Sequence, residues 1–483
     1  MNKCIFIFLL SSFTTILIAQ KKYLFITDEI INKSYAVNLE YYQPTKYEKN
    51  PIIIADKEWE EGVNCFGTVM YDEGKYRMWY QIYNEKEKND TRFKFTVGYA
   101  ESKDGINWSK PELGIINYKG NKNNNIVLTS YGKSDLYSPA VIKTDKTTDN
   151  KKYKMFYWDC MSDENLKKYG DPNPIGKTIP GWTAIPGEGL FAAFSNDGIN
   201  WGKYGTQPLF NCPCDASTVM KINDSTYQAF FKISTATDRH FRIIGTSVSK
   251  DFVNWPTPKI ILEPDHNDNY GTEFYGMSVT KYYNNYIGLL WIYNNSPSDK
   301  LMNIQLAISD DGNNWKRPKN RKTFMDTGQS GEWDAGGIVV ASEMLISPPG
   351  FKDKILIYYG GSTVRHDDSR RLHRENSIGL ATLRLDGFSA MTAKFFEGYF
   401  TTIPVKPDNT NMYINAEANK GYIEIELIDP TTNKTINKSK RIENNDSTKI
   451  EIEWINKMKL DNNKYYIFKF NMKKAKLFSF WFE

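Results

Sequence analysis

The sequence predicts an all-β protein, with a five-bladed β-propeller followed by a small C-terminal antiparallel β-sandwich. A turn motif of the form Ser-x-Asp-Gly-x-Asn-Trp recurs along the chain, and each copy follows three runs of strand-forming residues. Aromatic residues make up 14% of the chain, which favours strands. Near residue 398 the pattern changes to short runs that alternate apolar and polar residues, as in a half-buried sheet. No stretch has a convincing helical period.

The turn motif fixes the propeller because one three- or four-stranded unit cannot bury both of its faces alone and must stack against copies of itself. Asp-Gly suits the turn, since Gly accepts positive φ and Asp can bond its own backbone two residues on. We expect the Trp of each copy to fill the contact between adjacent blades. The copies occupy residues 102–108, 195–201, 249–255 and 309–315, with a degenerate fifth at 384–388.

Each blade is expected to take three successive strands from the chain. In blade one the turn Asp72-Glu73-Gly74 is a hairpin signal between the first two strands. Residues 159–188, rich in Gly, Pro and charge, should form a surface loop of blade two. The expected strands are 64–71, 75–83 and 93–102; 136–142, 153–158 and 189–194; 216–222, 226–233 and 241–248; 274–282, 286–293 and 302–308; and 336–342, 354–360 and 377–385.

Three segments divide the chain. Residues 1–19 read as a secretory signal peptide, with one positive charge, an apolar core and a small residue at the expected cleavage site after Ala19. Residues 20–398 should form the propeller and residues 399–483 the sandwich. We therefore expect a secreted or periplasmic protein, and no later segment is apolar and long enough to span a membrane.

The composition of the chain limits the partner molecules and cofactors to be expected. The net charge of +5 comes from 62 basic and 57 acidic residues without a basic block, which makes nucleic acid a poor candidate for a partner. A monomer is expected. Cys65, Cys160, Cys212 and Cys214 leave one disulfide an open question, and their spacing fits no zinc site. No cofactor is required, although the oxygen-rich cluster at residues 265–268 suggests structural calcium or simply a polar loop.

Carboxylates mark the start of the first strand of every blade, and those starts converge on one mouth of a propeller channel. Grouped carboxylates have pKa values split by repulsion and desolvation, which general acid and base chemistry requires. Asp215, Glu273 and Asp334 are the predicted catalytic residues, with Glu60 as the blade-one partner and Asp135 as an outer alternative that contacts substrate. Each has a structural alternative as well, because Asp215 can cap a turn and Glu60 stands in a run of charged residues.

Other side chains are candidates for binding substrate. Tyr137, Tyr275 and Trp333 could stack on the apolar face of a sugar, although most aromatics of such a fold are core residues. His366 and Arg239, with His240 and Arg242 beside the latter, suit an anionic group such as a uronate or sulfate. A surface position without function is the alternative for the histidine.

The repeats, the acids at the channel mouth and the C-terminal sandwich together resemble the five-bladed propeller glycosidases of glycoside hydrolase families 32 and 43. More narrowly, the chain resembles a bacterial group with a family 32 N-terminal-like domain. The resemblance implies three acids from the first three blades: a base or nucleophile, an orienting acid and a proton donor. The sequence departs from the pattern of invertases, since blade one offers Asn64-Cys65-Phe66-Gly67 and blade two has Tyr137-Ser138-Pro139 where Arg-Asp-Pro is usual.

The sequence therefore predicts a secreted glycoside hydrolase that acts on a plant or algal polysaccharide or its oligosaccharides through paired carboxylates. The alternative is a propeller that binds carbohydrate without cleaving it. A third interpretation is a scaffold or surface adhesion protein whose sandwich is the interacting part.

Overall fold

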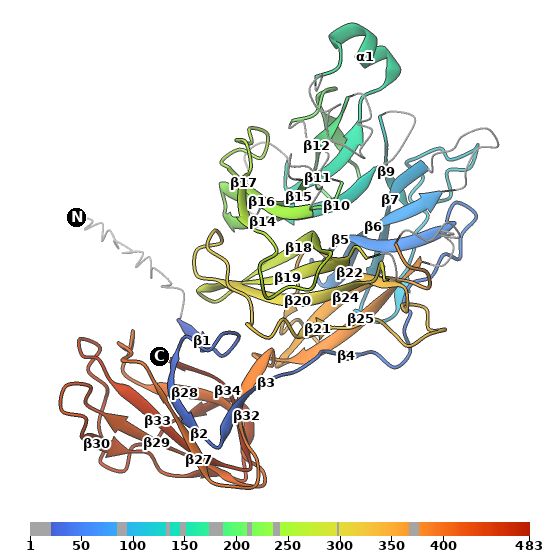
Figure 1. The fold of residues 1–483 in the computed structure, drawn as a ribbon. Coiled ribbons are helices and arrows are strands. Elements are labelled where there is room, and N and C mark those ends of the chain that lie inside the picture. Colours follow the sequence, from blue (N-terminus) through green and yellow to red (C-terminus); the bar gives the residue numbers. More distant parts are fainter. Residues whose placement is uncertain are drawn as a thin grey trace, which may run out of the picture.

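The structure is a computed structural model that describes residues 21–84, 94–131, 136–144, 151–172, 187–209, 215–234, 242–296, 299–366 and 376–483. These residues form seven antiparallel sheets. Five sheets make up the larger body at the upper right of Figure 1, and two make up the smaller one at the lower left. The predicted all-β class, with a propeller and a sandwich, is confirmed.

The five sheets of the propeller, numbered I to V here, follow one another along the chain, and each begins with its innermost strand. Sheet I contains β5 (Gly62–Asp72), β6 (Lys75–Asn84), β7 (Lys94–Ser102) and β8 (Trp108–Ser109), with β9 (Ile126–Thr129) paired to β7. Sheet II contains β10 (Tyr137–Lys143), β11 (Tyr153–Cys160), β12 (Glu188–Ser195) and β13 (Gly202–Tyr204). Sheet III contains β14 (Ser217–Asn223), β15 (Thr226–Ser234), β16 (Arg242–Ser249) and β17 (Lys259–Leu262).

The last two sheets complete the ring. Sheet IV contains β18 (Thr272–Tyr282), β19 (Asn285–Asn294), β20 (Met302–Ser309) and β21 (Thr323–Met325). Sheet V contains β22 (Gly337–Val340), β24 (Lys354–Ser362), β25 (Asn376–Arg384) and β4 (Thr45–Lys46), with β23 (Leu345–Ile346) paired to β24. Strand β4 comes from the N-terminal part of the chain, so sheet V joins the two ends of the propeller.

A ring of hydrogen bonds joins the innermost strands. In four places a hydroxyl donates to a backbone carbonyl of the next sheet, and between sheets I and II a backbone N–H donates to a hydroxyl. The five bonds are Val141 N to Thr68 Oγ1, Ser138 Oγ to Asp215 O, Thr218 Oγ1 to Met277 O, Ser278 Oγ to Val340 O, and Ser342 Oγ to Gly67 O. Because small hydroxyl side chains let these strands approach closely, the bonds link all five sheets about one axis.

The recurring turn owes its shape to its aspartate. In each full copy one carboxylate oxygen accepts two backbone N–H groups, and the other accepts the Asn side chain, at 2.6–3.0 Å. The Gly position has positive φ, and the third copy places Phe252 there with a φ of 71°. In the degenerate copy Asp386 instead binds groups outside its turn.

The Trp of each full copy contacts the sheet before its own, as predicted. Trp108 lies 5.8 Å from Tyr358 of sheet V, and Trp201 lies 6.5 Å from Trp79 of sheet I, measured between ring centroids. The other two pairs are Trp255 with Phe156 of sheet II and Trp315 with Phe230 of sheet III. These tryptophans are therefore structural.

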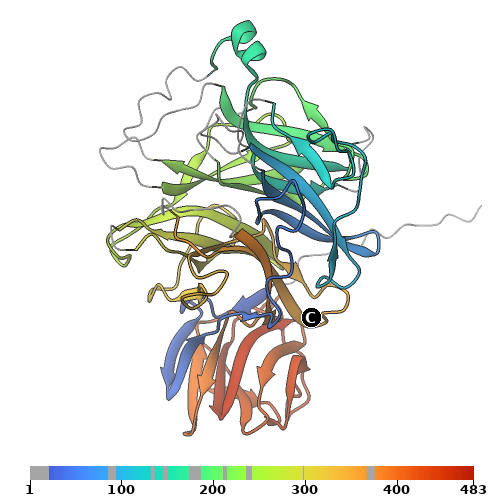
Figure 2. The same ribbon diagram turned by 90° about the vertical axis from the view of Figure 1, so that its right-hand side faces the viewer.

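The smaller body is a sandwich of two six-stranded sheets (Figures 1 and 2). One sheet contains β3 (Val37–Tyr41), β26 (Ser389–Ala393), β34 (Ala475–Phe482), β28 (Met412–Glu417) and β32 (Asp446–Glu451), with β1 (Lys22–Leu24) paired to β34. The other contains β2 (Ile31–Tyr35), β27 (Gly398–Thr402), β33 (Ile467–Lys473), β29 (Tyr422–Ile428) and β30 (Thr435–Lys438), with β31 (Ile442–Glu443) paired to β29. A separate apolar core fills the space between them.

The domain boundary in the structure differs from the predicted boundary. The sandwich begins at β26 rather than at residue 399, and it takes β1, β2 and β3 from the segment assigned to the propeller. Short strands with no turn motif cannot be assigned to a sheet until their distant partners are known. Residues 1–20, which hold the predicted signal peptide, lie outside the described residues.

A buried ion pair fastens the two bodies together. Lys22 Nζ lies 2.7 Å from Asp386 Oδ2, and both side chains are almost wholly buried. The same carboxylate accepts from Tyr282, Asn415 and Ser479, which come from sheet IV and the sandwich. The N-terminal strand therefore holds the sandwich against the propeller.

The described part of the loop predicted at residues 159–188 contains one short helix. Helix α1 (Asp163–Tyr169) begins with a Ser162 cap that accepts from the Asn165 N–H, and Gly170 follows it. None of its seven residues is buried, so the helix has no apolar face. The sequence of this segment therefore shows no helical period. In the described part of the chain, no helix has the length and apolar character needed to cross a membrane.

Candidate active site

Two predicted acids lie in one cluster of charged and aromatic side chains between sheets III and IV. The cluster, called the Glu273 cluster below, consists of Asp215, Lys232, Arg242, Glu273 and Tyr275. Asp215 lies just before the start of β14, and Glu273 is the second residue of β18. Both therefore lie at the starts of innermost strands, where the sequence pattern places them.

Asp215 forms an ion pair with Lys232 of β15. The lysine side chain is 3% exposed, whereas that of Asp215 is 20% exposed. The ammonium also lies 4.5 Å from the centroid of the Tyr275 ring. A buried cation thus holds a carboxylate that keeps part of its surface open.

Glu273 is the more deeply buried acid, with a side chain 3% exposed. It accepts a 2.5 Å hydrogen bond from Arg242 Nη1 and another of 2.5 Å from Asn295 Nδ2. Lys300 in turn donates to Asn295 Oδ1. The carboxylate of Glu273 is consequently fixed in orientation by one cation and one amide.

Arg242 pairs with Glu273 and interacts electrostatically with Asp215. Its guanidinium carbon lies 5.4 Å from the Tyr275 ring centroid and 5.1 Å from that of Tyr293, while 24% of its side chain is exposed. Burial opposes the charge of Arg242, but the nearby Tyr275, Glu273 and Asp215 outweigh that effect and raise its pKa. The site therefore keeps a positive charge beside both carboxylates.

His366, predicted to bind substrate, lies against the same cluster. Its Nε2 is 2.9 Å from the Tyr275 hydroxyl, and its ring centroid is 5.0 Å from that of Tyr293. Tyr275 is 9% exposed and its ring contacts two cations and a histidine, so it positions neighbouring groups more than it offers a free face.

Asp334 has different partners. It accepts from Lys46 Nζ at 2.7 Å and from the Tyr359 hydroxyl at 3.1 Å, and its side chain is 3% exposed. Lys46 belongs to β4, the strand that completes sheet V. Trp333 packs against Tyr359 with ring centroids 5.3 Å apart, so both residues support the closure of the ring.

Glu60 lies in a third environment. Its side chain is fully buried and accepts from Tyr80 at 2.8 Å, from Lys110 at 2.5 Å and from the Asp56 N–H at 3.2 Å. None of these contacts is with Asp215, Glu273 or Asp334. The arrangement favours a structural role within sheet I.

The remaining predicted residues are dispersed or lie outside the described part. Tyr137 packs between Phe95 and Trp158 with tilted and edge-on ring contacts, at centroid distances of 4.6 and 5.6 Å, where sheets I and II meet. Asp135 and Arg239 lie outside the described residues, as do Cys212 and Cys214. Cys65 and Cys160 are both buried.

Sequence reasoning missed Lys232, Asn295 and Lys300. One signal was available: Lys232 interrupts the apolar and aromatic residues 229–233 of a strand expected to be buried. A lysine in such a strand needs a carboxylate partner. Asn295 and Lys300 follow β19 in a loop without a motif, and the sequence carries no sign of their role.

Arginines bind the carboxylates of the predicted calcium cluster. Asp268 accepts two hydrogen bonds from Arg317, at 2.7 and 2.6 Å, and Asp265 accepts from Arg321. Among the described residues no group of three or more His, Cys, Asp or Glu side chains could hold a metal ion. Calcium at this position stays a prediction.

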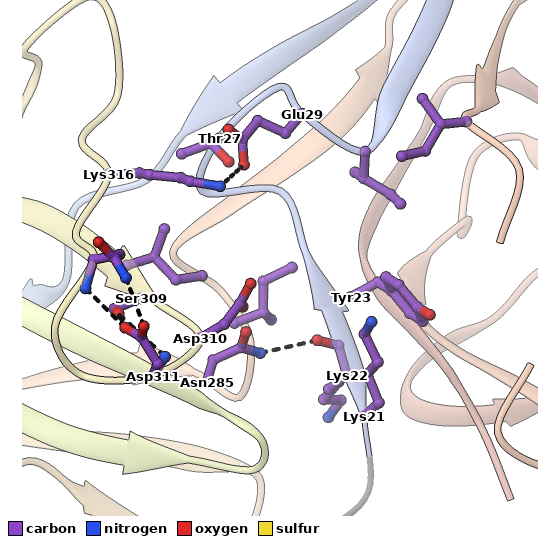
Figure 3. Close-up of a pocket in the computed structure, with 15 residues that line it drawn as sticks. Lys21, Lys22, Tyr23, Thr27, Glu29, Asn285, Ser309, Asp310, Asp311 and Lys316 are labelled. Carbon is purple, nitrogen blue, oxygen red and sulfur yellow. Dashed lines mark hydrogen bonds and ion pairs between the residues drawn. The ribbon is translucent and has the colours of Figure 1, made fainter. Parts of the chain in front are cut away.

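A pocket of about 380 Å³ lies at the junction of propeller and sandwich, away from the Glu273 cluster. Figure 3 shows Glu29 and Lys316 paired at one side of it and the chain at Lys21, Lys22 and Tyr23 at the other. The Glu29–Lys316 distance is 2.6 Å. Its lining is made of the contacts that join the two bodies, and it contains none of the predicted site residues.

Comparison with known proteins gives local and low-identity likenesses. No family model matches the chain. A stretch of 84 residues is 30% identical to a β-1,2-mannobiose phosphorylase of Thermoanaerobacter sp. (strain X514), which covers 16% of this chain and 28% of that protein. The chain thus matches less than a third of the length of this curated relative.

Solved structures of carbohydrate-active enzymes are also similar. A β-1,2-mannobiose phosphorylase from Listeria innocua is 12% identical with a TM-score of 0.47, over 71% of this chain and 97% of the other. A family 43 arabinoxylan arabinofuranohydrolase from Bacillus subtilis is 12% identical with a TM-score of 0.44, over 92% of this chain and 99% of the other.

Proposed function

We propose that the chain cleaves glycosidic bonds of an oligosaccharide or polysaccharide at the Glu273 cluster. The observation that carries the proposal is the meeting of two carboxylates from neighbouring sheets, Asp215 and Glu273, around one partly exposed arginine. Glycoside hydrolysis requires two acids that differ in environment. Asp215 and Glu273 differ in this way, since one is 20% and the other 3% exposed.

The two acids take different parts in this proposal. Asp215 retains open surface and is the group that meets the scissile bond. Glu273, held by Arg242 and Asn295, is the second carboxyl group of the pair, and it also fixes the arginine and through it the charge around the substrate. Asp334 and Glu60 stabilise the propeller in this scheme.

The resemblance to families 32 and 43 supports the substrate class, and the predicted signal peptide supports the location. We propose a secreted or periplasmic hydrolase that acts on plant or algal polysaccharides or their oligosaccharides. β-1,2-Mannobiose joins the candidates because the curated relative is named for it.

Phosphorolysis is the second candidate reaction. Lys232, Arg242 and Lys300 place three cations in and beside the cluster, where an attacking phosphate would need positive charge. The partial match to a phosphorylase supports the same reaction. In that case inorganic phosphate, rather than water, would attack the anomeric carbon and the product would be a sugar 1-phosphate.

The test is incubation of residues 20–483 with a panel of plant, algal and mannose-containing oligosaccharides, with and without inorganic phosphate, followed by chromatography. Free sugar without phosphate supports hydrolysis, and sugar 1-phosphate only with phosphate supports phosphorolysis. D215N should abolish either product. D224N is the matched control, because Asp224 lies in the turn between β14 and β15 and its side chain is 45% exposed.

Two results would overturn the proposal. Binding of a sugar without any product would favour the carbohydrate-binding propeller. Neither binding nor product across the panel would favour the scaffold.

A further inference from the structure

Two consecutive phenylalanines are exposed at one end of the sandwich. Phe395 is 75% and Phe396 is 80% exposed, and they are the only phenylalanines among the large exposed hydrophobic residues of the described part. They lie between β26 and β27, where the chain crosses from one sheet of the sandwich to the other.

Neither phenylalanine is needed to make this connection. The Lys474 N–H donates to the Lys394 carbonyl at 2.9 Å, and Gly398 packs closely on the backbone at Tyr35 and Ala36. These backbone contacts shape the loop whatever side chains follow Lys394. Exposed apolar side chains that serve no fold contact mark an interaction surface.

The end that carries Phe395 and Phe396 is the one farthest from the propeller. β3 runs from this end toward β4 of sheet V, and β26 runs back to it from the last turn of the propeller. Figure 1 shows this end at the bottom of the molecule, where β2 and β27 meet. We call it the sandwich tip; it consists of Tyr35, residues 394–397, Lys420 and residues 473–474.

Four lysines and one acid, Glu397, lie with the phenylalanines at the tip. Lys394, Lys420, Lys473 and Lys474 are all exposed. Lys394 is paired with Glu40 at 3.0 Å, whereas the ion pairs among the described residues leave the other three without a carboxylate partner. Tyr35, 66% exposed, adds a third aromatic side chain beside them.

We propose that the sandwich tip docks on an anionic phospholipid surface. Apolar side chains at a loop apex enter the boundary between head groups and acyl chains, while lysines around them meet lipid phosphates. A second copy of the chain fits less well, because a two-fold contact would set lysine against lysine. A soluble anionic polymer would engage the lysines but leave the two phenylalanines in water.

The test is co-sedimentation of residues 20–483 with vesicles of phosphatidylcholine alone and of phosphatidylcholine with phosphatidylglycerol. Binding should require the anionic lipid and weaken as salt rises, since charge is screened. F395S/F396S and K420Q/K473Q should each reduce the fraction bound by about tenfold or more. Y270S is the matched control, because Tyr270 is 86% exposed but lies in the loop before β18 of the propeller.

Several outcomes would overturn the docking proposal. These are no binding at low salt, equal binding to both kinds of vesicle, or full binding by F395S/F396S. Light scattering that shows a dimer lost in F395S/F396S would assign the tip to self-association instead. Retention by polygalacturonate that depends on the same residues, without vesicle binding, would assign it to an anionic polysaccharide.

Discussion

Two buried carboxylates of this propeller lie at the same distance from a cation, but the two cations differ in exposure. Glu60 lies 2.5 Å from Lys110, and Glu273 lies 2.5 Å from Arg242. The Lys110 side chain is 7% exposed, while that of Arg242 is 24% exposed. The first pair is enclosed within sheet I and its preceding segment, and the second joins sheets III and IV.

The difference shows that burial of an acid does not by itself mark a site. Glu60 receives all its hydrogen bonds from one region and presents nothing to a ligand. The Glu273 pair keeps an open cation, borders the partly exposed Asp215 and touches the aromatic pair of Tyr275 and Tyr293. Chemistry is therefore expected where a buried acid holds an accessible partner at a junction of sheets.

Of the changes that break one of these two pairs, E273Q should have the larger effect, and on activity alone. The amide cannot hold Arg242 by charge, so we expect kcat/KM to fall by about 10²–10⁴. The fold should survive because Arg242 keeps solvent contact. Steady-state kinetics on the substrate found with the panel, together with a thermal melt, measures both effects; unchanged kcat/KM would remove Glu273 from the site.

E60Q should show the reverse pattern. Lys110 would remain buried with only Asp56 as a charged partner, and breaking such a pair costs about 3 kcal/mol of unfolding free energy. Turnover per folded molecule should stay near that of the parent protein. Urea denaturation gives the free energy, and a large loss of kcat without loss of stability would contradict a structural Glu60.

The fold could be predicted in detail because its signals are local. The hairpin at Asp72-Glu73-Gly74 forms as expected, with φ of 50° at Glu73 and 81° at Gly74. The aspartates and tryptophans of the repeated turn likewise act within a few residues or on the adjacent sheet. In contrast, the pairing of β1, β2 and β3 with strands more than 300 residues away has no local signal.

The candidate site could be predicted only in part for the same reason. The start of each innermost strand is visible in the sequence, which is how Asp215 and Glu273 were found. Whether an acid at such a position keeps an open partner depends on side chains from distant parts of the chain, as Lys46 of β4 shows for Asp334. Glu60 and Glu273 both lie near the start of an innermost strand, and the exposure of their cationic partners separates them.

Asp159 extends the comparison to a buried acid without an ion pair in the described part of the chain. Burial raises its pKa to about 7, although Ser130 and the N–H groups of Tyr131 and Cys160 oppose this. The folded state therefore binds the proton more tightly than the unfolded state, and stability should fall as pH rises from about 4 to about 7. D159N should flatten that slope, which amounts to about 2–4 kcal/mol over the window.

Urea denaturation of the parent protein and D159N at a series of pH values measures the slope. The same slope in both proteins would show that Asp159 is not its source. D159N that is less stable than the parent protein at both pH 4 and pH 7 would show that the amide also disrupts the three hydrogen bonds.

The smallest effect is expected at an acid that is held by hydrogen bonds without any cation. Burial would raise the pKa of Asp197, but hydrogen bonds from Asn200, Ile199 and Ser195 outweigh it and lower the pKa to about 2. Its contribution to stability is complete above about pH 4 and is lost as pH falls toward 2. D197N should cost about 1–2 kcal/mol at pH 7 and less at pH 2, because the parent protein loses the same bonds there. Urea denaturation at the two pH values measures this loss of unfolding free energy. An equal loss at both values would mean that the turn depends on the shape of the Asp197 side chain. The charge of a buried acid would then matter only where a cation is its partner.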